Sequence, residues 1–298
     1  MEYHNPVLLH PSVDGLNIKP DGIYVDVTFG GGGHSREILS RLGAKGRLIA
    51  FDQDADALLN TIEDERFLLI HENFRFIKKF LRFYGIKSVD GILADLGVSS
   101  HQFDVPERGF STRFEGALDM RMNQSSALSA FEVVNHYEES ALKKVLSDYG
   151  ELRNAAAMAT TIVKARLTQE IASTEQLKLV LQKFLPSFKS HKILAQIYQA
   201  IRIEVNQEME VLKEFLQDSE TLLSSGGRLS VISYHSLEDR LVKRFMRNGI
   251  FEGEPERDFF GNFEVPFQMI EKLIVPTEAE IKINNRARSA KLRIAEKK

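Results

Sequence analysis

Cysteine and tryptophan are absent from the 298 residues, and no apolar run is long enough to span a membrane. Without cysteine the chain can form no disulfide, no cysteine-ligated zinc site and no cysteine-ligated iron–sulfur cluster. Residues 1–5 do not resemble a signal peptide, so we expect a cytoplasmic protein. The formal net charge is -3, which argues against a protein that coats nucleic acid non-specifically but allows local basic surfaces. We assign no residue to a metal site.

A run of four glycines is the most informative motif of the chain. The segment 28–34 reads TFGGGGH, and it follows an apolar stretch at 23–27 that is typical of a buried strand. Glycine lets the backbone approach a ligand closely because it has no Cβ. A second strand at 47–51 is followed by Asp52, and a carboxylate about 20 residues beyond such a loop can accept both hydroxyls of a ribose. These features predict a nucleoside site, the alternative being a glycine-rich turn without a ligand.

The loop does not match the fingerprint of dinucleotide-binding proteins. Counted from Gly30, the pattern G-x-G-x-x-G needs glycine where this chain has Ser35. Asp26 precedes the loop, where its carboxylate could reach a cationic ligand. S-adenosylmethionine has no pyrophosphate and carries an ammonium and a sulfonium, so it fits better than a nicotinamide cofactor. Because there is no thiolate, a methyl group would go directly to a heteroatom and not to a pyrimidine ring carbon.

Alternating strands and helices predict an α/β fold in the first hundred residues. Strands are expected at 23–27, 47–51, 67–71 and 91–95, and helices at 34–42, 55–62 and 74–83. This alternation predicts a parallel sheet whose ligands lie at the carboxyl ends of the strands. Gly33, Asp52, Phe74 and Asp95 should therefore line one crevice.

The pattern becomes helical in the middle of the chain. Residues 103–123 are expected to form a long loop and residues 129–203 mainly helices, one of which starts with a capping box at 173–176. The sheet is expected to resume with a helix at 208–224, a strand at 228–233, a helix at 236–247 and a hairpin-like pair near 271–275 and 290–295. We therefore expect a cofactor-binding domain of residues 1–105 and 204–298 and an inserted all-helical, substrate-recognition domain of residues 106–203.

Six segments in this order resemble the bacterial ribosomal RNA small-subunit methyltransferase H family, also called MraW. They read GGGGHS from residue 30, DLGVSS from 95, LDMRM from 118, QAIRIEVN from 199, YHSLEDR from 234 and RARSAKLR from 286. The resemblance runs from Tyr3 to about Glu296. It implies a class I (Rossmann-like) methyltransferase sheet with a helical insertion, and S-adenosyl-L-methionine as cofactor. It also implies N4-methylation of a cytidine in the decoding region of 16S rRNA, with small-subunit rRNA or the 30S particle as partner.

Matching these motifs to the family also assigns residues to the cofactor site. The implied cofactor-binding residues are Gly32, Gly33, His34, Asp52, Phe74, Asp95 and Gln102. The chain departs from the family's usual pattern at Tyr234, where phenylalanine is usual, and at Asn285, where proline is usual. The segment 154–161 is rich in alanine where basic residues are common.

Several of these residues admit a second role. Asp52 could instead cap the helix that follows, although Asp54 competes for that position. Phe74 could lie against the adenine or pack in the core, and Gln102 could read the adenine edge, contact the methionine end or be a surface amide. Asp95 could bind the cofactor amine, orient the target amine, or do both. Many amino-methyltransferases have Pro-Pro-Tyr after this position, and this chain has LGV, so the catalytic proton acceptor stays unassigned.

The roles of His34 and of the residues that start the helix at 236–247 also have two interpretations. His34 is either a donor in the loop or simply the first residue of its helix. A pocket for the target base could be lined by His235, Ser236, Glu238 and Asp239. Ser236 and Asp239 could equally form a capping box, and the two roles are compatible.

Contacts with RNA are expected from basic and aromatic residues. Two basic clusters could hold phosphates, namely the last fifteen residues and a helix face formed by Arg240, Lys243, Arg244 and Arg247, unless both are ordinary solvated surface. Stacking on an unpaired base would depend on Phe103, Phe110 or Phe114, which otherwise pack in a core.

Three other functions remain open at this point: a nicotinamide-dependent dehydrogenase, a protein methyltransferase and a non-catalytic RNA-binding assembly factor. The oligomeric state, monomer or homodimer, is also open.

If the basic C-terminal residues hold RNA, truncation before Asn284 should weaken RNA binding and its dependence on salt while sparing cofactor binding. If they instead form the last strand of the sheet, truncation should unfold the domain. RNA titration of the truncated chain distinguishes the two.

Overall fold

The computed structural model describes residues 6–260 and 263–298. Residues 1–5, including the start of the family resemblance at Tyr3, lie outside the described residues. The chain divides into two compact units, Met1–Gly97 with Met209–Lys298, and Val98–Glu208. The boundaries that we expected from the sequence, 105/106 and 203/204, fall a few residues away from these divisions.

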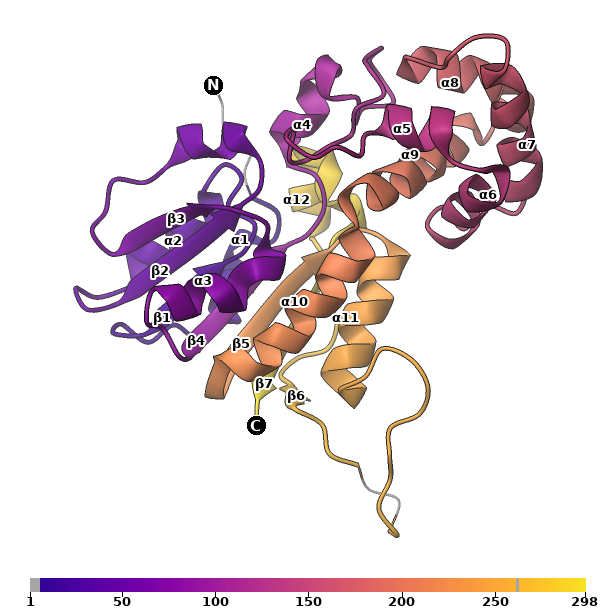
Figure 1. Ribbon diagram of the computed structural model, residues 1–298. Coiled ribbons are helices and arrows are strands. Elements are labelled where there is room, and N and C mark those ends of the chain that lie inside the picture. Colours follow the sequence, from indigo (N-terminus) through magenta and orange to yellow (C-terminus); the bar gives the residue numbers. More distant parts are fainter. Residues whose placement is uncertain (1–5, 261–262) are drawn as a thin grey trace. The chain divides into compact units, whose positions relative to one another are not determined.

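The first unit is built on a seven-stranded sheet in the order β3-β2-β1-β4-β5-β7-β6 (Figure 1). Its strands are β1 Ile23–Asp26, β2 Arg47–Asp52, β3 Phe67–His71, β4 Val89–Asp95, β5 Leu223–Ser233, β6 Phe267–Met269 and β7 Lys291–Lys297. The first five strands pair in parallel, and β7 is antiparallel to both β5 and β6. The predicted α/β fold is thereby confirmed.

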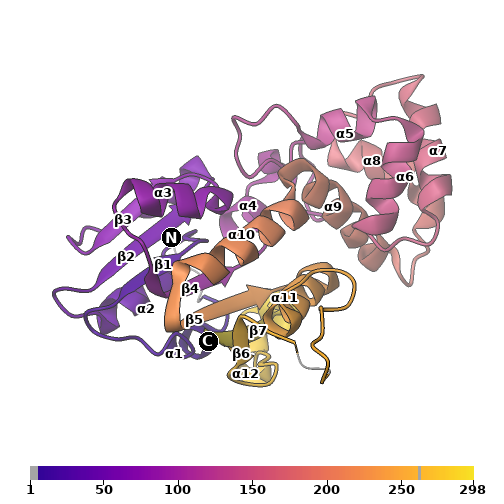
Figure 2. The same cartoon turned by 60° about the horizontal axis from the view of Figure 1, so that its bottom comes forward.

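Helices cover both faces of this sheet because its inner strands are apolar on both sides (Figure 2). One face packs against α3 Ile77–Phe83, α10 Glu208–Leu222 and α11 Ser236–Asn248. The other face packs against α1 Leu9–Asp14 and α2 Gly33–Arg41. Neighbouring residues of one strand alternate between the two layers: Val25 faces the first and Tyr24 the second.

Four short elements complete this unit. The 3₁₀ turns η1 Ala55–Asn60 and η2 Phe74–Phe76 follow β2 and β3, and α12 Glu278–Ile283 and η5 Asn285–Ser289 precede β7. The expected helix at 55–62 is thus a 3₁₀ turn, and the expected helix at 74–83 begins as one.

The first strand of the C-terminal pair was placed wrongly. We expected it near 271–275, but β6 is Phe267–Met269, and Ile274 forms only an isolated bridge with Leu292. The reason is burial: Phe267 is 2% exposed, whereas residues 271–273 are all exposed. The pairing of two antiparallel strands at this end of the chain is as predicted.

The second unit is helical and has its own core. Its elements are α4 Ser100–Asp104, η3 Pro106–Arg108, α5 Ala130–His136, α6 Glu139–Asp148, α7 Ala155–Arg166, α8 Thr174–Val180, η4 Gln182–Phe184 and α9 Ser190–Asn206. The capping box expected at 173–176 is present, with Ser173 and Gln176 as its two side chains. The expected loop at 103–123 contains only the end of α4 and η3. Within the described residues, no helix is both long and apolar enough to cross a membrane.

The basic C-terminal segment is an inner part of the sheet. β7 lies between β5 and β6, and Leu292 and Ile294 are 0% and 3% exposed. Arg293 and Lys291 both pair with Asp239, at 2.7 and 3.2 Å. The alternative that this segment forms the last strand of the sheet is therefore confirmed, and phosphate contacts of its exposed cations stay a prediction.

Deleting residues 284–298 is expected to unfold the first unit, because β5 and β6 lose the strand that joins them. A milder variant, Leu292→Ala, should lower the free energy of unfolding by about 2–5 kcal/mol. Denaturant titration followed by circular dichroism measures both effects. The exposed Arg288→Gln serves as control and should change stability by no more than about 0.5 kcal/mol. A truncated chain that unfolds cooperatively at the wild-type midpoint would contradict this role of β7.

Candidate active site

Polar residues gather where neighbouring parallel strands of the first unit end. Asp52 ends β2, the glycine loop follows β1, Asp95 ends β4 and Tyr234 follows β5. Because β2, β1, β4 and β5 are adjacent and parallel, these ends share one edge of the sheet. The carboxyl edge is where ligands bind in open α/β sheets.

The glycine loop has a conformation that other residues would strain. Gly30 and Gly32 have φ values of 50° and 75°, in the left-handed region that glycine adopts without cost. Gly33 begins α2, and a Cβ at this position would lie 2.1 Å from Cγ of Pro6. The Gly32 N–H donates to the Phe29 carbonyl at 2.7 Å, which closes the turn.

Asp52 holds this loop in place. Its carboxylate accepts hydrogen bonds from the N–H of Gly30 at 2.7 Å and of Asp54 at 2.9 Å. Burial raises the pKa of Asp52 to about 6, although both N–H groups act in the opposite direction. The η1 turn is capped by Asp54, which accepts from the Asp56 N–H, so Asp52 is not the cap. A carboxylate with two N–H partners still has lone pairs for hydroxyl donors.

Asp26 ends β1 and is fully enclosed by the protein. It is 0% exposed and accepts hydrogen bonds from Ser35 Oγ at 2.7 Å and from the Thr28 N–H at 3.1 Å. Burial raises the pKa of Asp26. The idea that Asp26 contacts a cationic ligand is therefore wrong, and its contacts instead fix the loop to α2.

His34 is also largely enclosed, with 5% of its surface exposed. Its Nε2 lies 3.2 Å from the Val7 carbonyl oxygen, and its Nδ1 lies 3.9 Å from Oδ2 of Asp95. His34 thus links α2 to the N-terminal segment and faces Asp95.

Asp95 is positioned from three sides. The hydroxyl of Tyr234 donates to its Oδ1 at 2.7 Å, its own N–H donates to Thr28 Oγ1 at 2.7 Å, and His34 faces its Oδ2. Burial raises the pKa of Asp95 to about 6, while His34 and the Tyr234 hydroxyl oppose this shift. The side chain is 23% exposed, so it can still meet a ligand. Burial and the neighbouring carboxylate raise the pKa of Tyr234 well above its usual value.

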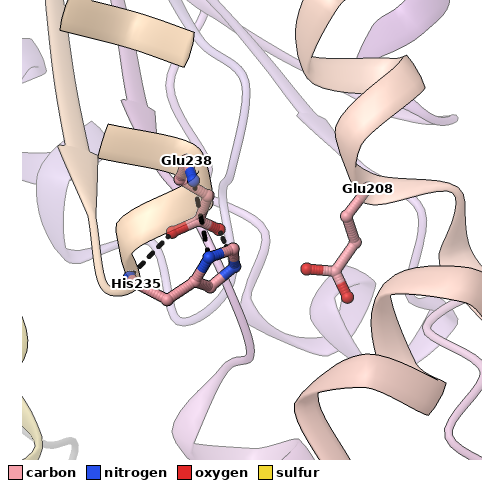
Figure 3. Close-up of side chains that lie close together, drawn as sticks. All are labelled: Glu208, His235 and Glu238. Carbon is pink, nitrogen blue, oxygen red and sulfur yellow. Dashed lines mark hydrogen bonds and ion pairs between the residues drawn. The ribbon is translucent and has the colours of Figure 1, made fainter. Parts of the chain in front are cut away.

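The N-terminus of α11 differs from the sequence-based expectation. The capping box consists of His235 and Glu238 and not of Ser236 and Asp239. The carboxylate of Glu238 accepts a hydrogen bond from the N–H of Tyr234 at 2.8 Å. It also accepts one from the N–H of His235 at 3.3 Å (Figure 3). Asp239 turns instead to β7, where Arg293 and Lys291 lower its pKa. The cap thus also holds the backbone of Tyr234.

The two remaining expected cofactor residues have local partners. Phe74, in η2, is half-buried, and its ring meets Phe215 edge-on at 5.3 Å. Gln102 belongs to the second unit, where it is 4% exposed and completes a capping box with Ser99 at the start of α4. Their contacts with a cofactor remain predictions.

The three aromatic residues named for base stacking differ in exposure. Phe103 and Phe110 pack into the core of the second unit, and Phe114 is 49% exposed.

Sequence reasoning missed Tyr234 as a partner of Asp95. The only signal was its place directly after β5, together with its departure from the phenylalanine usual in the family.

The strand order with antiparallel β7 between β5 and β6, together with the glycine loop after β1 and the acid that ends β2, is the architecture of a class I methyltransferase. The model of the MraW methylase family matches residues 1–298, so the chain belongs to that family, as its motifs predicted. It is 74% identical over 297 residues to ribosomal RNA small subunit methyltransferase H of Flavobacterium johnsoniae, covering 100% of this chain and 98% of the relative. The protein of the same name from Bacteroides thetaiotaomicron is 57% identical over 299 residues, covering 100% and 98%.

Solved structures are more distant. An rRNA methylase from Streptococcus thermophilus has a TM-score of 0.44 and 14% identity, covering 100% of this chain and 98% of that chain. Membership of the family makes the chain a methyltransferase that depends on S-adenosyl-L-methionine, as predicted. The dehydrogenase alternative is wrong.

Tyr234→Phe should raise the pKa of Asp95 above its present value of about 6, because the variant loses a hydrogen bond that stabilises the charged carboxylate. A carboxyl-carbon NMR titration measures the change. The exposed Tyr84→Phe is the control and should leave the Asp95 titration unchanged. An Asp95 titration that is the same in Tyr234→Phe and wild type would show that the bond has no effect on ionisation.

Proposed function

We propose that this enzyme transfers a methyl group from S-adenosyl-L-methionine to N4 of a cytidine in the decoding region of 16S rRNA. Relatives at 74% and 57% identity carry the name of a small-subunit rRNA methyltransferase, which supports this substrate. The observation that carries the chemistry is the pair of carboxylates, Asp52 and Asp95, on either side of the glycine loop. The absence of cysteine favours a nitrogen acceptor over a ring carbon.

The residues at this edge fit the cofactor. Asp52 would accept the ribose hydroxyls, and the backbone of Gly32, Gly33 and His34 would border the methionine part. Phe74 and Gln102 are the candidates for the adenine. When bound, the cofactor supplies a methyl group that its sulfonium already activates. The carboxylates suit a ligand with cationic groups, because a positive charge relieves the cost of burying them.

Asp95 is the candidate for orienting the amine. The lone pair of a cytosine amino group is shared with the ring, so the nitrogen is a weak nucleophile. A carboxylate that accepts an N–H bond would hold the amine in line with the methyl group. Alignment of this kind can contribute about 7–11 kcal/mol. A pKa of about 6 keeps Asp95 ionised near neutral pH, ready to accept the hydrogen bond.

The target base has to leave its stack, because N4 of a paired cytosine is engaged in the duplex. We expect the substrate to be small-subunit rRNA or the 30S particle in the cytoplasm.

Asp52→Asn should weaken binding of S-adenosylhomocysteine about 10- to 100-fold, because hydrogen bonds to a charged acceptor are stronger than those to an amide. Isothermal titration measures this, with the exposed Glu63→Gln as control. In wild type, affinity should fall as the pH drops below about 6, since Asp52 and Asp95 then take up protons. Unchanged affinity in Asp52→Asn would remove Asp52 from the site.

Incubation with 30S particles and labelled cofactor, followed by mass spectrometry of the nucleosides, should give N4-methylcytidine. Asp95→Asn separates the two roles of that residue. A lower kcat with unchanged cofactor affinity assigns it to the target amine, and weaker cofactor binding assigns it to the cofactor amine. A methyl group found on a ring carbon or on protein would overturn the proposal.

A further inference from the structure

The segment around α3 is strongly basic in a chain of formal net charge -3. From residue 73 to residue 89 there is no acidic residue, and the cations are Arg75, Lys78, Lys79, Arg82 and Lys87. Aromatic residues alternate with them at positions 74, 76, 80, 83 and 84. This combination of cations and rings is typical of surfaces that bind single-stranded nucleic acid.

The helix separates its core side chains from the others. Ile77 and Leu81 are each 0% exposed and pack into the core beneath the helix. Phe76, Phe83 and Tyr84 are 41%, 80% and 44% exposed, so these rings are not needed to fill the core. Contiguous exposed apolar patches that are bordered by polar residues mark interaction sites.

We call the exposed face formed by Phe76, Lys79, Arg82, Phe83 and Tyr84 the α3 surface. Two shallow hollows lie on it and beside it, of about 400 and 560 Å³. Lys79 and Arg82 line both hollows.

Acidic groups next to the α3 surface are already engaged. In α10, Glu214 pairs with Arg75 at 2.7 Å and Asp218 lies 3.6 Å from Lys78. Among the residues that the structure describes, Lys79 and Arg82 form no ion pair with an acid. The ammonium of Lys79 lies 5.9 Å from the centre of the Phe76 ring, so cation and ring share one spot.

We propose that the α3 surface binds a single-stranded RNA segment that flanks the methylated cytidine, an inference that rests on the proposed function. Lys79 and Arg82 would contact phosphates, and Phe83 and Tyr84 would stack on bases. The topology supports this placement, because η2 and α3 begin directly after the carboxyl end of β3. Phe76, at the start of the α3 surface, is therefore next to the edge of the sheet that holds Asp52 and Asp95, and Arg82, Phe83 and Tyr84 lie further along, toward the start of β4.

Charge and geometry disfavour other occupants. Two copies of the chain that met through this face would bring like charges together. A membrane surface would need a continuous apolar face, and on the α3 surface Lys79 and Arg82 interrupt the exposed rings. An acidic protein shares the charge complementarity but does not call for rings that stack on bases.

The test uses the full-length protein and a fluorescein-labelled single-stranded RNA of about 12 nucleotides, followed by anisotropy at several salt concentrations. The double variant Lys79→Gln/Arg82→Gln should bind the RNA about tenfold more weakly. The slope of log affinity against log salt should fall by about 1.4, or about 0.7 for each lost phosphate contact. Phe83→Leu keeps an apolar side chain but removes the ring. It should also bind about tenfold more weakly, with the salt slope unchanged.

Lys45→Gln/Arg47→Gln is the matched control, because it removes the same charge from exposed positions at the amino end of β2. It should bind RNA as wild type does. All variants should bind S-adenosylhomocysteine normally, which verifies that they are folded. Wild-type RNA affinity in both α3 variants, or an equal loss in the control, would overturn the inference. A wild-type enzyme that binds RNA through the α3 surface yet forms no N4-methylcytidine would instead contradict the proposed function.

Discussion

The hydrogen bond from the Gly30 N–H to the Asp52 carboxylate is the contact on which the site depends. It joins the loop after β1 to the end of β2 at 2.7 Å and fixes the glycines in left-handed conformations. The same carboxylate keeps lone pairs for a ligand, so one side chain both builds the loop and can receive a ribose. The buried Asp26 completes this support by tying the loop to the start of α2.

Burial gives the carboxylates their chemical character. Asp52 and Asp95 have pKa values raised to about 6, because burial removes them from water. The groups that oppose this shift do not outweigh burial: two N–H donors at Asp52, and His34 and the Tyr234 hydroxyl at Asp95. The folded protein therefore holds protons on them that the unfolded chain releases, and its stability falls as the pH rises from about 4 to about 6. A cationic ligand offsets this cost, which couples cofactor binding to ionisation.

Basic residues in this chain serve two different purposes. Lys291 and Arg293 neutralise Asp239 and help to hold β7 within the sheet, so their charge is used by the fold. Lys79 and Arg82 lie on a helix whose apolar residues already form the core, so their charge faces outward. Sequence clusters of lysine and arginine do not distinguish these cases, because the difference lies in which acids the fold brings next to them.

The sequence by itself determined the parallel strands, the glycine loop and the importance of Asp52, because apolar periodicity and glycine content are local properties. The order of the six motifs indicated the family, and the family implied the cofactor. Only the tertiary structure decided that β6 forms at Phe267, that Asp239 pairs with Arg293 in β7, and that Tyr234 holds Asp95 across 139 positions of the chain. Such contacts depend on which distant strands become neighbours, and residue spacing carries no information about that.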